Sequence, residues 1–508
     1  MRPAQIADCS RFLKNFCLSG GSSLEELCYT FPNQPGSELT NIPDRITHTL
    51  ILLIFLISAG LRLGLVVFNR ESNDDHFAVI QLILKTDRLP EKADCWECYQ
   101  PKLFHFTAAK FLQLTGRENS DPSSMILAVE LINYTAGLIT ILVIGLFLDR
   151  LSDKNGLLKG IAFGLVALNP GLIGINAQVT NDTFAILFST LALFCTYAFL
   201  QKKRPVTFLL MLLFTILGIC SKTNVWITAI AILLALVVKA WLDKPERARM
   251  LWSAGLFGLA SLVLSIFNPF NQYISNVRDY GSPILLNIDQ QPLPHFFKQT
   301  SAARPGILSI QDGFFTFKFG DLLGYPRNEN GYVYTQTRTS LWTQLYARAN
   351  SVHFDNWPIS WSTSGEQGFA LSRTIYILAL LPTLLLLAGA AMEIFLFLKS
   401  LINRDPNLVA ETHFGLTAVT FIGFVLFIIL YALEYRDYSV MKAIFLYPAM
   451  LVFSLLFLRT GESLSVRLPE RFRWVRTGFV IWMVALFVLY SADIVTMAAL
   501  LYSRRFGM

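Results

Sequence analysis

Long apolar runs are the feature that most constrains this chain. An α-helix needs about twenty mostly apolar residues to cross the hydrocarbon core of a bilayer, and eleven such runs can be read along the 508 residues. They lie at 46–68, 125–149, 156–175, 182–200, 205–220, 223–242, 250–268, 371–398, 413–433, 438–458 and 478–501. The fifth is short, and Lys442 interrupts the tenth. The pattern predicts an all-α polytopic membrane protein.

The charged residues agree with a membrane location. The chain is 54% hydrophobic and only 15% charged, whereas soluble domains carry about 25% charge. A formal charge of +7 could indicate nucleic-acid binding. However, the basic residues form short clusters between apolar runs rather than one stripe, so we expect them to set membrane orientation and expect no nucleic-acid partner.

The positive-inside rule gives that orientation. With residues 1–44 as a cytoplasmic tail, seventeen basic residues fall in the inside loops: Arg150, Lys154, Lys159, Lys202, Lys203, Arg204, Lys239, Lys244, Arg247, Arg249, Lys399, Arg404, Arg459, Arg467, Arg471, Arg473 and Arg476. The short outside loops hold three: Lys222, Arg436 and Lys442. The tail lacks the features of a cleaved secretory signal, so the first run is expected to be retained. An odd span count leaves Arg504 and Arg505 outside.

Two long segments then face the exterior. Residues 45–268 are expected to hold spans one to seven, including an external loop at 69–124, and residues 371–508 to hold spans eight to eleven. The loop contains amphipathic stretches at His76–Arg88 and Leu103–Leu114, which we expect to be interfacial helices. The second external segment, 269–370, is long enough for a small folded cap.

The unusual ionisable residues all fall on the external side. Charges at membrane depth cost about 2.5–3.5 kcal/mol on insertion scales, so charges at span ends are candidate functional groups. They are Asp74, Asp75, Asp182, Lys222, Arg436, Asp437 and Lys442. Their shared placement is the strongest functional signal in the sequence.

This set of groups suits glycosyl transfer from a lipid phosphate. A carboxylate takes the acceptor proton, and cations stabilise the departing phosphate. Asp74 or Asp75 is the candidate base, and Lys222, Arg436 and Lys442 are candidate phosphate contacts. Structural alternatives remain open: the acidic pair as a solvated helix start, Asp182 as a helix N-cap, Lys222 as a snorkelling turn residue, and Arg436 as a partner of Asp437.

Cys95-Trp96-Glu97-Cys98 is a separate motif. The two cysteines can form a local disulfide, stay as thiols, or bind a metal together with His76 and His105. A full set of four metal ligands at familiar spacing is absent. We therefore assign no metal site and no definite cofactor, and leave open whether a divalent metal is needed.

The chain resembles the GT-C membrane glycosyltransferases, in the branch of protein O-mannosyltransferases and lipid A aminoarabinose transferases. The resemblance rests on the acidic pair after span one, on Tyr99-Gln100-Pro101-Lys102-Leu103-Phe104-His105, which is similar to the His-Pro-Pro-Leu or Gln-Pro-Pro-Leu-Tyr segment of that loop, and on Asn169-Pro170 followed by Asn181-Asp182. Eleven spans with a large insertion between the seventh and eighth also match. Lys102 departs from the pattern by replacing the second proline.

The resemblance implies an inverting transfer from a polyprenyl- or dolichyl-phosphate sugar to an unknown acceptor outside the cytoplasm, in a bacterial inner membrane or the endoplasmic reticulum. An acidic residue of the first loop would serve as base, and His76, Gln100, His105, Asp182, Lys222, Arg436 and Lys442 would bind substrate. The alternatives are a ligase that uses a polyprenyl-diphosphate oligosaccharide, a multi-pass transporter or flippase, and a non-catalytic scaffold.

Overall fold

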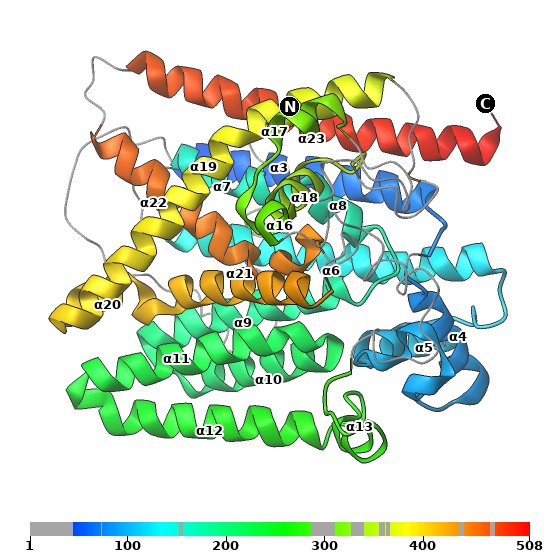
Figure 1. Cartoon of the computed structure of the whole chain (residues 1–508), viewed down its shortest axis with the longest axis horizontal. Coiled ribbons are helices and arrows are strands. Elements are labelled where there is room, and N and C mark those ends of the chain that lie inside the picture. The colour runs from blue at the N-terminus through cyan, green and yellow to red at the C-terminus, as the bar shows by residue number, and fades with distance from the viewer. Residues whose placement is uncertain are drawn as a thin grey trace, which may run out of the picture.

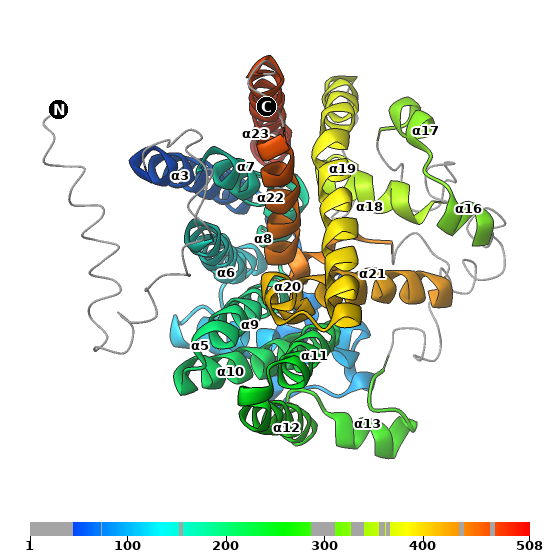
Figure 2. The same cartoon turned by 90° about the vertical axis from the view of Figure 1, so that its left-hand side faces the viewer.

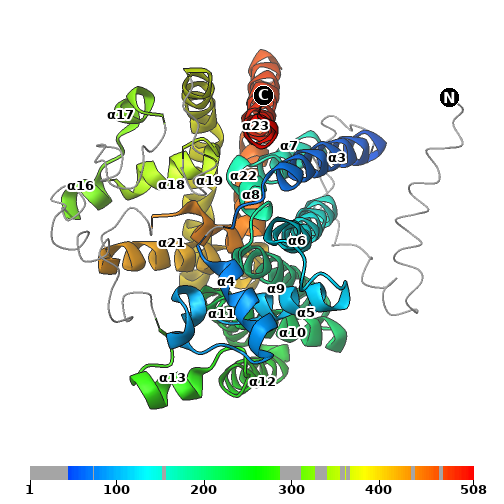
Figure 3. The same ribbon diagram turned by 90° about the vertical axis from the view of Figure 1, so that its right-hand side faces the viewer.

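The chain folds into a bundle of long helices, which the three orthogonal views show (Figures 1, 2 and 3). The computed structural model describes residues 44–72, 74–151, 156–285, 310–326, 340–354, 361, 366–435, 441–467 and 473–507. Within these ranges every regular element is a helix and no strand is present. The predicted all-α membrane fold is confirmed.

Nine helical segments in the described part of the chain are long and apolar enough to cross a membrane, or ten when a bent pair counts as one span. The helices that form the nine are α3 (Asp44–Phe68), α6 (Pro122–Arg150), α9 (Asp182–Lys202), α11 (Trp226–Leu242), α12 (Arg247–Ile266), α19 (Glu366–Asn403), α21 (Leu416–Tyr435), α22 (Met450–Arg467) and α23 (Arg473–Phe506). Length and composition therefore do not confirm the predicted count of eleven.

The third predicted span is broken into two helices. α7 (Gly156–Ala167) and α8 (Pro170–Asn176) meet at a 50° bend. Asn169 caps α8 by accepting a bond from the Leu172 amide at 2.9 Å, and Pro170 lacks the amide that would continue α7. The bend is stabilised from α3, because Arg62 is fully buried and its Nη1 donates to the Ala167 carbonyl at 2.8 Å.

The fifth predicted span is the short helix α10 (Pro205–Ser221), of 17 residues. It returns alongside α9, since the Asn181 amide at the start of α9 donates to the Ser221 carbonyl at 2.9 Å. At the opposite end, Lys239 of α11 donates to the Leu200 carbonyl at 2.6 Å. α10 thus runs antiparallel to α9 and α11, which are parallel to each other.

The tenth predicted span begins later than the apolar pattern indicated. Lys442 lies in non-helical backbone before the 3₁₀ helix η12 (Ala443–Ala449), which continues as α22. The prediction that Lys442 falls within a span starting at 438 is therefore wrong for this residue. Its side chain is placed at the end of the bundle, where a charge costs less than at membrane depth.

The first loop forms a compact layer at the end of the bundle that Figure 3 faces. It consists of α4 (His76–Thr86), the 3₁₀ turns η3 (Lys92–Asp94) and η4 (Trp96–Tyr99), and α5 (Leu103–Leu114). Phe77, Ile80 and Ile83 of α4 and Phe104 of α5 are buried in one apolar cluster with the ends of α6 and α9. Both predicted amphipathic helices are present, although the first ends at Thr86 because Asp87 adopts a left-handed conformation (φ 49°).

The described part of the second loop contains short helices joined by turns and irregular segments. Its helices are α13 (Tyr273–Tyr280), α16 (Ile310–Phe315), α17 (Phe319–Gly324) and α18 (Leu341–Asn350). α18 packs against α8, α19 and η12, and the Asn169 side chain donates to the Ala349 carbonyl at 2.9 Å. The remaining elements are η5 (Thr223–Val225), η6 (Lys244–Glu246), α20 (Pro406–Glu411) and η10 (His413–Gly415).

Replacing the buried arginine tests the role of the bend. We expect Arg62→Met to destabilise the protein by about 1–3 kcal/mol, because the Ala167 carbonyl and the Asn176 side chain lose a charged donor. The measurement is the thermal unfolding midpoint in detergent. The exposed Arg117→Met is the matched control and should leave the midpoint unchanged. An Arg62→Met midpoint equal to that of the wild type would contradict this role.

Candidate active site

The acidic pair lies in a strained turn between α3 and α4. Asp74 and Asp75 both have positive φ values, 52° and 55°. Aspartate visits this left-handed region more readily than most residues, and strained backbone often clusters at functional sites. The two side chains diverge. Asp75 is exposed, whereas the Oδ2 atom of Asp74 accepts a bond from Lys442 Nζ at 3.0 Å.

A second ion pair joins two other segments. Asp182 is the first residue of α9, and Lys222 follows α10. Lys222 Nζ lies 2.5 Å from Asp182 Oδ1, and the Thr180 hydroxyl donates to the other carboxylate oxygen at 3.0 Å. The side chains of Lys222 and Asp182 are 14% and 9% exposed. The sequence left open that Asp182 is the N-cap of α9. In the structure Asn181 occupies the N-cap position, and Asp182 is the first residue within the helix.

The two ion pairs belong to one electrostatic cluster. Lys222 Nζ also lies 5.3 Å from the centre of the Phe445 ring, three positions beyond Lys442. The charge of Lys222 acts on Asp74 and on Glu97, as does that of Lys442. Burial alone would raise the pKa of the Asp74 carboxyl, but the positive charges around it, chiefly Lys442, outweigh burial and lower that pKa. Asp74 is therefore held ionised.

Two buried histidines, His76 and His105, lie next to this cluster. His76 Nδ1 and His105 Nε2 lie 3.0 Å apart, and the side chains are 2% and 0% exposed. Burial lowers the pKa of His76 to about 4 and that of His105 well below its usual range. Both imidazoles are thus neutral near pH 7. One ring nitrogen donates and the other accepts, which fixes α4 against α5.

Gln100 connects the first loop to the start of α9. Its Oε1 accepts a bond from Asn181 Nδ2 at 2.6 Å, and its amide nitrogen donates to Glu97 Oε2. The Asn181 nitrogen also reaches the Ser221 carbonyl next to Lys222. Gln100 therefore links three separate segments of the cluster.

Lys102, which departs from the pattern of the resembled families, stabilises the same loop. Its side chain is 1% exposed, and Nζ donates to the carbonyls of Cys98, at 2.5 Å, and Gln100. Burial lowers the pKa of Lys102 to about 7. A proline at this position would restrict the backbone directly. Lys102 instead stabilises the turn that holds Gln100 through these two hydrogen bonds.

Cys95 and Cys98 form a disulfide, which agrees with one of the three alternatives that the sequence left open. Between them, Glu97 turns inward and is 3% exposed. Burial and, after it, the negative charge of Asp74 together raise the pKa of the Glu97 carboxyl to about 8, while Lys222 opposes the shift. Glu97 is a site residue that sequence reasoning missed, because the motif was read only for its cysteines.

The structure brings together seven of the nine predicted site residues: Asp74, His76, Gln100, His105, Asp182, Lys222 and Lys442. Asp75 points to the surface instead, and Arg436 lies outside the described residues. Arg348 of α18 supports the cluster from the second loop, since its Nη1 donates to the Met441 carbonyl at 3.2 Å. In the described ranges, no group of three or more histidine, cysteine or acidic side chains is arranged to hold a metal.

This arrangement can bind an anion and move a proton. Two ammonium groups, Lys222 and Lys442, come from segments far apart in the sequence, and each is paired with a carboxylate. An incoming phosphate can share these ammonium groups. Asp74 is ionised and Glu97 is protonated, so two neighbouring carboxyl groups are held in different states, which is how acid and base roles are separated in enzymes.

Comparisons with known proteins support the resemblance noted in the sequence. A family model described as dolichyl-phosphate-mannose-protein mannosyltransferase matches residues 100–269, about one third of the chain. The match includes Gln100, His105, Asp182 and Lys222. No curated protein matches the chain.

Two solved structures are similar to this chain. The archaeal oligosaccharyltransferase AglB from Archaeoglobus fulgidus, in complex with an inhibitory peptide and a dolichol-phosphate, is 13% identical with a TM-score of 0.47. That alignment covers 90% of this chain and 56% of AglB, so this chain spans little more than half the AglB length. ArnT from Cupriavidus metallidurans, in the apo state, is 16% identical with a TM-score of 0.33, covering 82% of this chain and 76% of ArnT.

The protein is an integral, multi-pass membrane protein that resembles the GT-C glycosyltransferases.

The buried Glu97 carboxyl predicts a pH dependence of stability. A pKa raised from 4.5 to about 8 means that its contribution to stability is complete below about pH 4.5 and is lost as pH rises through 8. At about 1.4 kcal/mol per pKa unit, the loss amounts to a few kcal/mol. As pH rises from 5 to 9, the unfolding midpoint of Glu97→Gln should rise relative to that of the wild type, because the variant has no carboxyl group to deprotonate. Glu91→Gln, an exposed change in the same loop, should retain the wild-type slope. Equal slopes in all three proteins would contradict the burial argument.

Proposed function

We propose that this chain, which resembles the GT-C membrane glycosyltransferases, transfers a sugar from a polyprenyl- or dolichyl-phosphate carrier to an acceptor on the non-cytoplasmic side. The observation that carries the proposal is the cluster of two lysine–carboxylate pairs, Asp74–Lys442 and Asp182–Lys222, at one end of a membrane bundle. The cluster supplies a base and two cations where a lipid phosphate reaches the membrane surface.

The sidedness of the site is inferred from charge. Seventeen basic residues in the short loops of one side against three on the other favour a cytoplasmic position for the first group. The direction of α10 supports a count of eleven spans, with loops 69–124 and 269–370 and the final helix end outside. α3 and α23 support an odd count as well, because they run parallel with Phe68 and Tyr502 rings 5.2 Å apart.

The proposed reaction is a single inverting displacement. Asp74 accepts the proton of the acceptor hydroxyl, whose oxygen attacks the anomeric carbon while the bond to the carrier phosphate breaks. Lys222 and Lys442 stabilise the phosphate dianion that leaves. Arg436, between α21 and Lys442 in the sequence, is proposed as a third phosphate contact. His76, Gln100, His105 and Asp182 position these groups and the sugar.

Donor binding would also activate the base. Lys442 contributes the largest of the charge effects that lower the pKa of Asp74. When a phosphate shares the Lys442 ammonium, that stabilisation of the carboxylate weakens and its pKa rises. Asp74 therefore becomes a stronger base only when the donor is in place, which limits proton transfer to the loaded enzyme.

The first test is donor turnover by purified protein in lipid. We expect Asp74→Asn to lower the release of polyprenyl phosphate from a panel of polyprenyl-phosphate monosaccharides by about 10²–10⁴-fold, because a positioned base is lost. Asp75→Asn, which keeps the turn and removes an exposed carboxylate, should stay within a few-fold of wild type. Normal turnover by a folded Asp74→Asn protein would remove Asp74 as the base and direct attention to Asp182.

The phosphate contacts separate this function from its closest rival, a ligase that uses diphosphate-linked oligosaccharides. We expect Lys222→Gln to weaken turnover of the monophosphate donor by about 10–100-fold, since a hydrogen bond between charged groups contributes about 1.5–3 kcal/mol. The matched control is Lys110→Gln, a change of a partly exposed lysine on α5. Turnover of diphosphate-linked oligosaccharide alone would establish the ligase instead. Transport of an intact carrier without sugar transfer would favour a flippase.

A further inference from the structure

A second cationic pocket lies where the ends of α3 and α23 meet. Its volume is about 300 Å³, within the lower range of small-ligand pockets. Phe68 and Leu501 form its apolar part, and Arg70, Arg504, Arg505 and Ser123 are among the polar residues around it. None of these residues belongs to the cluster around Asp74.

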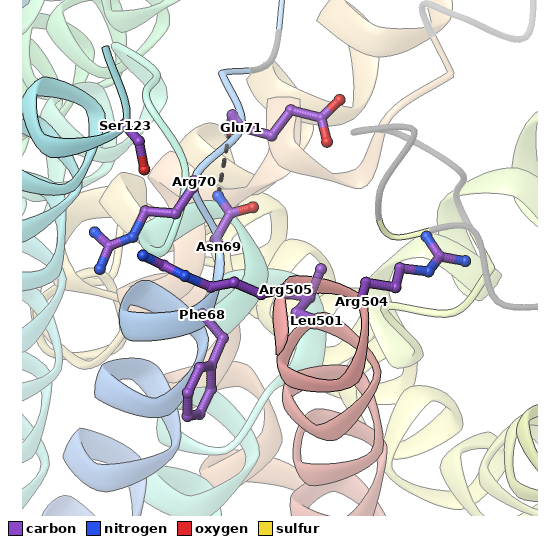
Figure 4. Close-up of a pocket in the computed structure, with 8 residues that line it drawn as sticks. All are labelled: Phe68, Asn69, Arg70, Glu71, Ser123, Leu501, Arg504 and Arg505. Carbon is purple, nitrogen blue, oxygen red and sulfur yellow. Dashed lines mark hydrogen bonds between the residues drawn. The ribbon is translucent and has the colours of Figure 1, made fainter. Parts of the chain in front are cut away.

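Two of the arginines direct their charges at the same place. Figure 4 shows the guanidinium groups of Arg70 and Arg505 side by side near Ser123, while Arg504 points away on the other side of α23. The Glu71 carboxylate also points away from the two guanidinium groups. The pocket thus concentrates positive charge at one wall.

Part of the Arg70 guanidinium makes no hydrogen bond with the described residues. Its Nε and Nη1 atoms are shielded from solvent and donate no hydrogen bond to the described part of the protein. Burial, followed by the nearby charge of Arg505, lowers the pKa of the Arg70 guanidinium; Glu130 and Asp121 oppose the shift without forming an ion pair with it. Arg505 beside it donates through Nη1 to the Val67 carbonyl at 3.4 Å. A shared anion stabilises two guanidinium groups that lie this close together.

The surroundings favour phosphate among anions. Guanidinium groups bind phosphate oxygens through paired donors, and the hydroxyl of Ser123, in the first turn of α6, adds a donor. Below the arginines lie the apolar side chains of Phe68 and Leu501, and α3 leading up to the pocket exposes further apolar side chains, Leu63 and Val67. A phosphate attached to an apolar chain matches both parts.

We propose that Arg70, Arg505 and Ser123 form a phosphate-binding site at the membrane surface, separate from the cluster around Asp74. The phosphate reaches it either as the headgroup of a membrane lipid or as a free ion. The site does not depend on the proposed glycosyl transfer, because none of its residues has a role in that reaction.

The test compares the two sources on the full-length protein. Thermal midpoints are measured in phosphatidylcholine nanodiscs that contain increasing fractions of phosphatidic acid, and separately with inorganic phosphate in solution. The variants are Arg70→Gln and Arg505→Gln. Arg117→Gln removes the same charge from an exposed position of the first loop and serves as the control. Native mass spectrometry of the wild type counts bound phosphatidic acid without relying on a variant.

We expect phosphatidic acid to raise the midpoint of the wild type and of Arg117→Gln, with an apparent affinity about tenfold weaker in Arg70→Gln and Arg505→Gln. The same pattern with inorganic phosphate alone would also support the site and identify a soluble phosphate as its ligand. The proposal fails if neither phosphate source shifts the wild-type midpoint and no lipid is retained, or if the two variants respond as strongly as the control.

Discussion

The bilayer requires that every backbone group leaving a helix finds a partner within the protein, and this constraint organises the centre of the structure. At the bend between α7 and α8, Arg62 and Ser58 both donate to the Ala167 carbonyl. After α8, the Asn133 side chain donates to the carbonyls of Gln178 and Thr180, at 2.7 and 2.8 Å. These hydrogen bonds satisfy backbone carbonyls in the irregular segment that joins α8 to α9.

The position of the candidate site follows from those bonds. Thr180 and Asn181 present Asp182 to Lys222 and join it to Gln100. The first loop then adds two neutral imidazoles and a protonated Glu97, while Asp74 stays ionised beside Lys442. Burial keeps the imidazoles and Glu97 uncharged, whereas the positive charge of Lys442 keeps the buried Asp74 ionised. The same layer therefore holds groups of both kinds within one small volume.

Apolar periodicity and charge distribution are sufficient to predict the helices, their approximate bounds and the side chains gathered at one end. Long apolar runs have few alternatives in a membrane, so their helices are well predicted. The bend at Asn169 was not expected, because its cost depends on the distant Arg62. The later start of α22 was missed for a similar reason, since apolar residues continue through the non-helical segment that holds Lys442.

Within the site, residue type was easier to predict than orientation. The sequence does not distinguish Asp74 from Asp75. In the folded protein the left-handed backbone conformation directs Asp74 toward Lys442 and leaves Asp75 at the surface. Glu97 is an ordinary loop carboxylate until the disulfide and Gln100 direct it inward. Lys102 looked like a loss of the expected proline, yet its hydrogen bonds are visible only once the turn is folded. These outcomes depend on contacts between distant segments.

The packing of α3 against α23 has a consequence for the order of synthesis. Leu65 and Val66 of α3 are fully buried in a cluster with Ile494 and Met497 of α23, and Arg505 donates to a carbonyl 438 positions earlier. At a translation rate of roughly 5–20 residues per second, this separation corresponds to tens of seconds. During that time α3 must expose its inner face to lipid or to an assisting protein. The bundle is closed by the last helix described, so a ribosome that stalls before α23 leaves an inserted but open protein for membrane quality control to remove.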